Sequence, residues 1–183
     1  MNFPITYCPN FFSRPEEIIE LSKTLDYHAP GKNENWKGLR SKSLHLIKPD
    51  LSSYIINKVL SLYYDFDIEQ IKWDNTYTAF QKMNDEYIDH NDIHTDEDSE
   101  LAGIIYLNKN SSMNNGTSVY NDRNRIISVS NEFNSLLCYD SKFKHSATDC
   151  IGERLNIVFF VDTLQVKKTP LDRFRRVNLN YDF

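Results

Sequence analysis

The stretch Ile71-Lys72-Trp73-Asp74-Asn75-Thr76-Tyr77-Thr78-Ala79-Phe80 decides the fold class of this 183-residue chain. Ile71, Trp73, Tyr77 and Ala79 stand at alternate positions, interrupted only by Asn75. Successive side chains of a strand point to opposite faces of a sheet, and aromatic and β-branched residues favour strands. The stretch therefore predicts a β-strand with one face buried.

Further short strands follow this stretch toward the C-terminus. They are predicted at Ala102–Leu107, Thr117–Tyr120, Arg125–Val129, Ser135–Tyr139 and Arg154–Val161. Asn-rich polar clusters separate several of them, at Asn108–Asn115, Asn121–Asn124 and Asn131–Asn134. Several short strands at this spacing indicate a β-sandwich or barrel.

The N-terminal third is predicted to be mainly helical. Ser13-Arg14-Pro15-Glu16 has the pattern of a capping box, and a short apolar stripe follows as far as Asp26. A second helix is expected to open at Asp50, after Pro49, with apolar residues at helical spacing. Ser43 to Ile47 is predicted as a strand between the two helices. Helices on one face of the predicted sheets give an α+β fold.

Length and patterning predict one domain over residues 1–183. Residues 1–70 would be a helical N-terminal support, residues 71–162 the β core and residues 163–183 a C-terminal tail. No apolar run approaches the length of a membrane span, and the N-terminus lacks the pattern of a signal peptide. We therefore expect no membrane association.

The cysteine content and the net charge indicate the cellular compartment and the kind of partner. Cys8, Cys138 and Cys150 are scattered and odd in number, which indicates reduced thiols and a cytoplasmic location. A net charge of −5 argues against duplex nucleic acid as a partner, although the basic segment Lys167–Arg176 leaves this open. The acidic segment Asp85–Glu100 is either solvated surface or an acidic mouth around a cation site.

The triplet His94-Thr95-Asp96 is the first candidate for chemistry. In an extended segment its His94 and Asp96 side chains point the same way, so both can face one metal ion. A facial set of two histidines and one carboxylate binds Fe(II) and leaves open positions for other ligands. His145, which follows a predicted strand of the β core, is the expected third ligand.

Arg154 stands nine residues after His145, at the start of the apolar strand Leu155–Val161. A guanidinium beside a buried strand requires an anion, and its planar N–H groups match a carboxylate. Two readings follow: a clamp for the far end of a bound dicarboxylic acid, or an ion pair with a neighbour such as Glu153.

The set of motifs from about Trp73 to Val161 resembles the catalytic core of the 2-oxoglutarate- and Fe(II)-dependent dioxygenases, in their prolyl 4-hydroxylase-like branch. The matching pieces are His94-Thr95-Asp96, Ala102–Asn108, Asn115–Tyr120, Phe133–Tyr139, His145 and Arg154. The resemblance implies a double-stranded β-helix, or jelly-roll, with N-terminal helices packed on one sheet. It also favours His94-Thr95-Asp96 over the second triplet His90-Asn91-Asp92, because only the former leaves the family's short loop before the next strand.

By this resemblance, His94, Asp96 and His145 would bind Fe(II), and Arg154 would pair with the distal carboxylate of 2-oxoglutarate. Tyr106 would share that carboxylate, and it could also be an ordinary core tyrosine. Further co-substrate or substrate contacts are expected from two residues of the preceding strand, Gln81 and Tyr77. The family activates O2 and releases succinate and CO2, with hydroxylation as its usual outcome.

The sequence departs from the family pattern at two loops that shape the substrate entrance. Asn84-Asp85-Glu86 lacks the glycine common in relatives, and Asn115-Gly116-Thr117 has a single glycine. The substrate therefore stays open between a peptide residue and a small molecule. The segment Trp36–Ser41 is either part of the cavity mouth or ordinary surface. Two other functions are weighed: a non-catalytic jelly-roll that binds or supports a partner, and a different metal enzyme on a cupin-like barrel.

Overall fold

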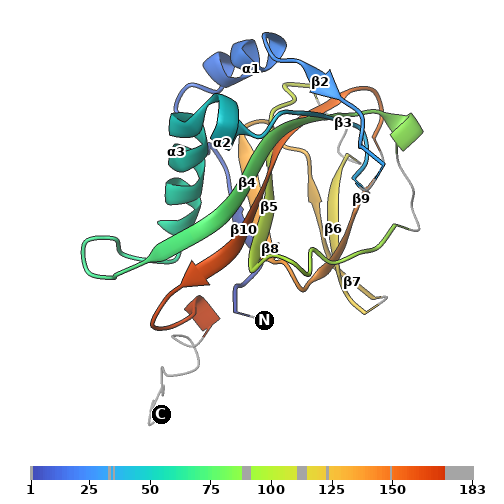
Figure 1. Cartoon of the computed structure of the whole chain (residues 1–183). Helices are drawn as coiled ribbons and strands as arrows, with labels where there is room; N and C mark the ends of the chain where they lie inside the picture. Colours follow the sequence, from blue (N-terminus) through green and yellow to red (C-terminus); the bar gives the residue numbers. More distant parts are fainter. Residues whose placement is uncertain are drawn as a thin grey trace.

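Two antiparallel sheets dominate this computed structural model, which describes residues 2–32, 34, 36–87, 92–110, 115–122, 124–148 and 150–171 (Figure 1). The strands of the larger sheet are β1 (Thr6–Cys8), β2 (Tyr27–His28), β3 (Leu39–Ser41), β4 (Lys72–Met83), β5 (Leu101–Tyr106), β8 (Ser135–Asp140) and β10 (Arg154–Gln165). They lie in the order β1-β8-β5-β10-β4-β3-β2. The smaller sheet consists of β6 (Gly116–Asn121), β7 (Asn124–Ser130) and β9 (Lys144–Ala147), in the order β7-β6-β9.

Three α-helices, α1 (Pro15–Lys23), α2 (Leu44–Ile47) and α3 (Pro49–Leu60), lie on the N-terminal side of the sequence, and a 3-10 turn, η1 (Asp85–Tyr87), follows β4. Figure 1 shows the helices on one face of the larger sheet. The Ser52 hydroxyl of α3 lies 2.7 Å from that of Thr78 on β4, and the buried side of α3 packs in the same apolar core as β4. The predicted α+β jelly-roll with helices on one sheet is confirmed.

Strand β5 shows how the predicted period of two builds two separate cores. Leu101 and Ile105 belong to the apolar core shared with the helices. Ala102 and Tyr106, on the other face, pack with Val119 of β6 in the space between the sheets. The inner face, where the two sheets meet, therefore has a core of its own, separate from the core beneath the helices.

One predicted strand is wrong. Residues 44–47 form the helix α2, in which the Ser43 carbonyl accepts hydrogen bonds from the N–H groups of Leu46 (3.0 Å) and Ile47 (3.3 Å). A strand would bury Leu44 and Leu46 on one face, yet Leu44 is fully buried and Leu46 is 75% exposed. Residues 44–47 therefore form one helical turn, and the nearest strand, β3, lies just before them in the sequence.

The predicted capping box is also wrong. Helix α1 begins at Pro15 with Arg14 as its N-cap, and no side chain caps the helix there. The Glu16 carboxylate pairs with Lys109 at 3.1 Å rather than reaching back to Ser13. Pro15 at the first position needs no N–H partner, so the helix starts without the box.

The short strands β1, β2, β3 and β9 were not predicted. His145 lies on β9, in the smaller sheet, whereas Arg154 begins β10 in the larger sheet. Arg154 therefore faces the sheet that carries His145 from the opposite sheet. His90 and Asn91 of the alternative triplet lie outside the described residues, as does the tail beyond residue 171. None of the described helices combines the length and apolar character that a membrane span requires.

Candidate active site

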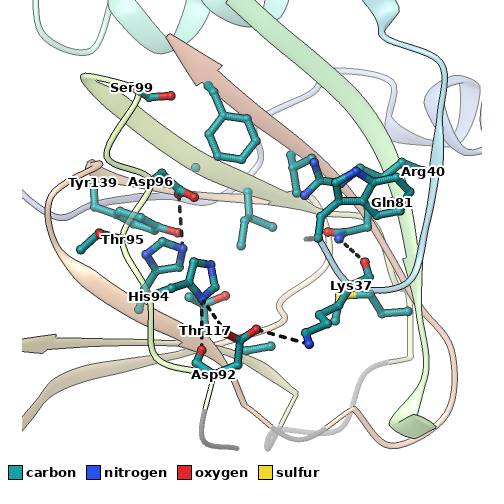
Figure 2. Close-up of a pocket in the computed structure, with 18 of the residues that line it drawn as sticks. Lys37, Arg40, Gln81, Asp92, His94, Thr95, Asp96, Ser99, Thr117 and Tyr139 are labelled. Atoms are coloured by element: carbon teal, nitrogen blue, oxygen red, sulfur yellow. Dashed lines mark hydrogen bonds and ion pairs between the residues drawn. The ribbon is translucent and has the colours of Figure 1, made fainter. Parts of the chain in front are cut away.

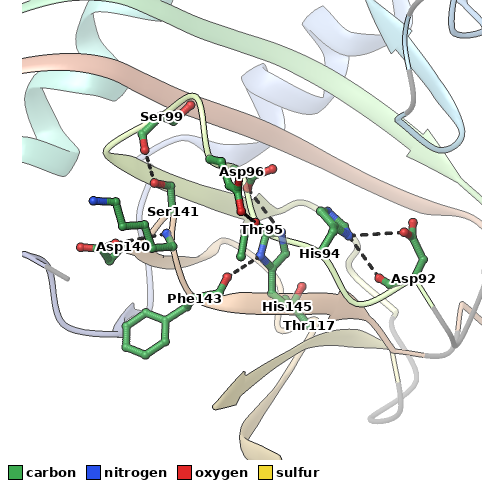
Figure 3. Close-up of polar contacts among 12 residues, drawn as sticks. Asp92, His94, Thr95, Asp96, Ser99, Thr117, Asp140, Ser141, Phe143 and His145 are labelled. Carbon is green, nitrogen blue, oxygen red and sulfur yellow. Dashed lines mark hydrogen bonds and ion pairs between the residues drawn. The ribbon is translucent and has the colours of Figure 1, made fainter. Parts of the chain in front are cut away.

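Three predicted metal ligands lie together at one end of the smaller sheet. One donor atom from each of His94, Asp96 and His145 lies within 4.8 Å of the others. His145 Nε2 is 3.3 Å from Asp96 Oδ2, and the two imidazole rings are 4.5 Å apart between centroids (Figure 3). Residues about fifty positions apart in the sequence thus lie side by side.

Backbone pairing holds this arrangement. The N–H of His94 donates to the His145 carbonyl at 3.0 Å, and the reverse bond is 2.8 Å. The N–H of Asp96 donates to the carbonyl of Ser141, also at 3.0 Å, and the Ser141 hydroxyl donates to the carbonyl of Ser99. The segment that carries His94 and Asp96 is therefore fixed against the turn that precedes β9.

Both imidazoles are oriented by their Nδ1 atoms. His94 Nδ1 lies 3.1 Å from the Asp92 carbonyl oxygen, and His145 Nδ1 lies 3.1 Å from that of Phe143. A carbonyl at Nδ1 accepts a hydrogen bond, so the proton stays there and Nε2 keeps a free lone pair. Each histidine is thereby set to offer Nε2 as a ligand.

Burial and charge favour a neutral His145 beside the Asp96 carboxylate. The side chain of His145 is 8% exposed, that of Asp96 19% and that of His94 47%. Burial lowers the pKa of His145, the neighbouring Asp96 carboxylate raises it in part, and His94 lowers it further. The net direction favours the neutral form, which is the one that binds a metal ion.

Asp92 of the alternative triplet lies on the far side of His94. Its carboxylate is 3.6 Å from His94 Nδ1 and 4.0 Å from Lys37 Nζ. It therefore orients His94 rather than joining the three-residue cluster.

A cavity of about 390 Å³ opens beside the cluster (Figure 2). Its apolar floor is formed by Ile104, Val158 and Phe160. The polar lining comes from all sides, with the residues Lys37, Arg40, Gln81, Asp92, His94, Asp96, Glu97, Asp98, Thr117, Tyr139, His145 and Arg154. The volume is within the range of small-molecule sites in proteins.

Arg154 reaches from the larger sheet across the cavity to the smaller one, and only 1% of it is exposed. Its Nη1 donates to the Gly116 carbonyl at 2.8 Å and its Nη2 to the Thr117 hydroxyl at 3.4 Å. Its Nε is 3.2 Å from the amide oxygen of Asn156, in the orientation that satisfies both groups of that amide. Every one of these acceptors is neutral, and one N–H on each Nη remains.

No carboxylate in the described part of the chain forms an ion pair with Arg154, which argues against the predicted alternative of a Glu153 pair. A buried cation without a counter-charge is costly. The guanidinium is therefore held, by neutral groups, ready for an anion that enters the cavity.

Tyr106 lies next to this guanidinium, which is 5.3 Å from the centroid of its ring. The Tyr106 hydroxyl donates to the Thr117 hydroxyl at 2.8 Å, and burial raises its pKa, so it keeps its proton and can donate. Tyr106, Thr117 and Arg154 form a cluster of donors and acceptors at one end of the cavity. The sequence offered no role for Thr117, although it stands in the quoted segment Asn115–Tyr120.

The two other predicted contacts differ in position. Gln81 lines the cavity, and its Nε2 donates to the Lys37 carbonyl at 2.7 Å. Tyr77, four residues earlier on β4, packs against the ring of Phe160 with centroids 6.0 Å apart and lies 5.8 Å from the Arg40 guanidinium. It supports the cavity wall rather than forming it.

The predicted mouth segment does reach the cavity, through Trp36, Lys37 and Arg40. Tyr139, which was given no role, packs its ring 4.8 Å from that of His145. Its position at alternate spacing on an apolar strand marks it as a core residue and gives no sign of the metal cluster.

The donor set is compatible with a divalent transition metal, because it combines two neutral imidazoles with one carboxylate on one side of an open cavity. Hydrogen bonds at both Nδ1 atoms supply the outer support that such sites use. The cluster of Arg154, Tyr106 and Thr117 lies in the same cavity, where it could hold a carboxylate of a second ligand.

The fold is shared with solved oxygenase structures. A prolyl-4-hydroxylase from Pseudomonas putida is similar with a TM-score of 0.56 and 12% identity, over 87% of this chain and 92% of that one. A 2OG-Fe(II) oxygenase family oxidoreductase from Burkholderia pseudomallei gives a TM-score of 0.59 and 12% identity, over 88% and 85% of the two chains.

HygX from Streptomyces hygroscopicus, solved with nickel, 2-oxoglutarate and hygromycin B bound, gives a TM-score of 0.58 and 14% identity, over 88% of this chain and 84% of that one. No protein-family model matches the sequence, and no curated protein matches it either. At these identities the likeness establishes the jelly-roll fold.

Proposed function

We propose that this protein is an Fe(II)- and 2-oxoglutarate-dependent dioxygenase that oxidises a small molecule or a peptide residue, with hydroxylation as the default outcome. One observation carries the proposal: a fully buried arginine that pairs with no carboxylate of the described residues shares a cavity with a cluster of two histidines and an aspartate. A site for a metal alone would have no use for that cation.

In this proposal His94, Asp96 and His145 hold Fe(II), and Arg154 receives the distal carboxylate of 2-oxoglutarate with help from Tyr106. The bound iron would supply O2 activation coupled to the conversion of 2-oxoglutarate to succinate and CO2. The chain itself binds and orients. The Arg154 cluster fixes one end of the co-substrate, the apolar floor excludes water, and the Nδ1 contacts keep both imidazoles in the ligand tautomer.

The solved structures add support of a general kind. They are a prolyl-4-hydroxylase, a 2OG-Fe(II) oxygenase family oxidoreductase and a protein with nickel, 2-oxoglutarate and hygromycin B bound. The same fold thus occurs in a prolyl-4-hydroxylase and in a protein that binds hygromycin B, so the fold alone favours no substrate class for this chain.

Succinate formation tests the proposal. Protein loaded with Fe(II) under air should convert 2-oxoglutarate to succinate, slowly without a second substrate. His94→Ala should abolish this turnover, whereas His45→Ala, an exposed histidine of α2, should leave it unchanged. Equal succinate formation by both variants would contradict the assignment, and failure of the unsubstituted protein to bind 2-oxoglutarate in the presence of Fe(II) would favour a non-catalytic jelly-roll.

A further inference from the structure

A second arginine lines the cavity and is not used by the proposed co-substrate site. Arg40 lies on β3, across the cavity from Asp96 in Figure 2. Its Nε is buried and has no hydrogen-bond acceptor among the described residues, and no described carboxylate forms an ion pair with it. Two guanidinium groups, those of Arg40 and Arg154, therefore line the cavity, and the proposed co-substrate would place a carboxylate against Arg154 alone.

Three aromatic rings surround the Arg40 guanidinium. Its central carbon lies 4.9 Å from the ring centroid of Trp36, 5.8 Å from that of Tyr77 and 5.9 Å from that of Phe160. Such contacts stabilise a cation through the plane of the guanidinium, whereas its N–H groups point outward within that plane. Tyr77 also forms a side-chain hydrogen bond with Arg40, whereas Nε has no acceptor among the described residues, so part of the N–H edge stays available to a carboxylate.

The backbone around Arg40 is held against β4 by close packing and hydrogen bonds. Gly38 has a φ of +83°, and a Cβ there would lie 2.3 Å from the carbonyl oxygen of Lys82, so only glycine allows the segment to approach β4 this closely. Arg40 then pairs with Gln81 in the β3–β4 register. Gln81 in turn donates to the Lys37 carbonyl at 2.7 Å, which ties the segment to the strand on both sides of the glycine.

Burial makes this cation costly without an anion. Burial lowers the pKa of Arg40, and the nearby Tyr77, Asp96 and Glu34 raise it only in part. A guanidinium keeps its charge in proteins even so, and an incoming anion would recover part of the desolvation cost. Because Arg40 lines the same cavity as His94, Asp96 and His145, such an anion would lie in the chamber that also receives the reacting carbon.

We propose that Arg40 binds the carboxylate of the molecule that is oxidised, and that this substrate is a small carboxylic acid. The inference rests on the proposed function, which assigns Arg154 to 2-oxoglutarate. The volume of about 390 Å³ is at the low end for ligand sites, yet it has to receive the co-substrate and the reacting part of the substrate. The floor of Ile104, Val158 and Phe160 would contact the hydrocarbon between the carboxylate and the reacting carbon.

Trp36 provides a direct reporter of the Arg40 site. The chain has two tryptophans, so Trp73→Phe leaves Trp36, whose ring lies against Arg40, as the sole source of tryptophan emission. This variant, loaded with Fe(II) and saturating 2-oxoglutarate without O2, is titrated with propionate and, separately, with propionamide at constant ionic strength. We expect a saturable change in emission with propionate and none with propionamide.

Adding Arg40→Gln should weaken the propionate response by about tenfold or more, the cost of losing one charge-assisted carboxylate contact. Arg14→Gln, at an exposed arginine far from the cavity lining, should leave the response unchanged. In the Trp73→Phe protein, equal responses to propionate and propionamide, or no saturable response to propionate, would overturn the inference. This outcome does not depend on whether the Arg40→Gln protein folds.

The two proposals fail in different ways. The same titration in an Arg154→Met background without 2-oxoglutarate reads the Arg40 site alone, so a propionate response there supports it even if 2-oxoglutarate does not bind. Binding of 2-oxoglutarate itself is followed by equilibrium dialysis. If Arg40→Gln weakens 2-oxoglutarate binding as much as Arg154→Met does, Arg40 belongs to the co-substrate site and the inference is refuted.

Discussion

Replacing Arg154 gives the sharpest test of how the cavity works. In Arg154→Met the side chain keeps similar length and apolar bulk but loses the guanidinium that now donates to Gly116 and Thr117. The remaining N–H on each Nη is proposed to bind one oxygen of the distal carboxylate. Hydrogen bonds to a charged group contribute about 1.5 kcal/mol or more each, so two of them amount to about 3 kcal/mol.

That free energy corresponds to a rise of roughly 100-fold in the KM for 2-oxoglutarate, since about 1.4 kcal/mol equals one factor of ten. Arg154→Lys keeps the charge but loses the planar fork, and we expect a rise of about tenfold. The assay is succinate formation at a series of 2-oxoglutarate concentrations. Arg14→Met, at an arginine whose side chain is 76% exposed, is the matched control and should behave as the unsubstituted protein.

Thermal unfolding separates this effect from a folding defect. Arg154→Met loses hydrogen bonds to neutral acceptors, which destabilises the folded state, but it also removes a buried charge that pairs with no described carboxylate, which stabilises it. Because the two effects offset each other, the ligand-free Arg154→Met protein should have a Tm within a few degrees of that of the unsubstituted protein. At about 100 times its Kd, 2-oxoglutarate stabilises the unsubstituted protein by about 2.7 kcal/mol, and the substituted protein should lose this shift. A folded Arg154→Met protein whose KM stays within about threefold would refute the reasoning.

Three further predictions concern the ligands and the core. Asp96→Asn removes the one carboxylate of the cluster and should weaken Fe(II) binding at least about 100-fold, as measured by equilibrium dialysis. Asp67→Asn, at an exposed turn, should leave the affinity for Fe(II) unchanged. Unchanged affinity in Asp96→Asn would exclude Asp96 as a ligand. Tyr106→Phe removes a single hydroxyl donor and should raise the KM for 2-oxoglutarate about tenfold without lowering Fe(II) affinity; a parallel loss of Fe(II) binding would mean that Tyr106 supports the metal site instead. Gly103→Ala would place a Cβ 2.4 Å from Phe159 Cζ and 2.6 Å from the Leu137 carbonyl oxygen, and should lower the unfolding free energy by about 2 kcal/mol, or the Tm by roughly 4 to 8 °C. Gly31→Ala, where a Cβ would meet only the Glu34 carboxylate at 3.3 Å, is its control, and equal Tm values for the two variants would show that β5 can shift at no cost.

The sequence by itself determined the β core and singled out the residues of the candidate site. Alternation with a period of two, as in Ile71–Phe80, reflects burial on one face of a strand, and that is a local property written in neighbouring residues. The chain also marked His94, Asp96, His145 and Arg154, because few histidines are available and a charge at the start of an apolar strand stands out.

The tertiary structure decided what those residues face. β9 and the strands β1 to β3 are too short to carry a periodic signal, and residues 44–47 form a helical turn because only one of the two alternating leucines finds a core to enter. Thr117 and Arg40 acquire their surroundings only when β6 and β3 lie beside residues far away in the chain. The sequence identified Arg154 as a cation that requires an anion. It could not show which groups surround Arg154, or that a second arginine, Arg40, lines the same cavity. Both depend on contacts between the two sheets and β3, which no local sequence pattern encodes.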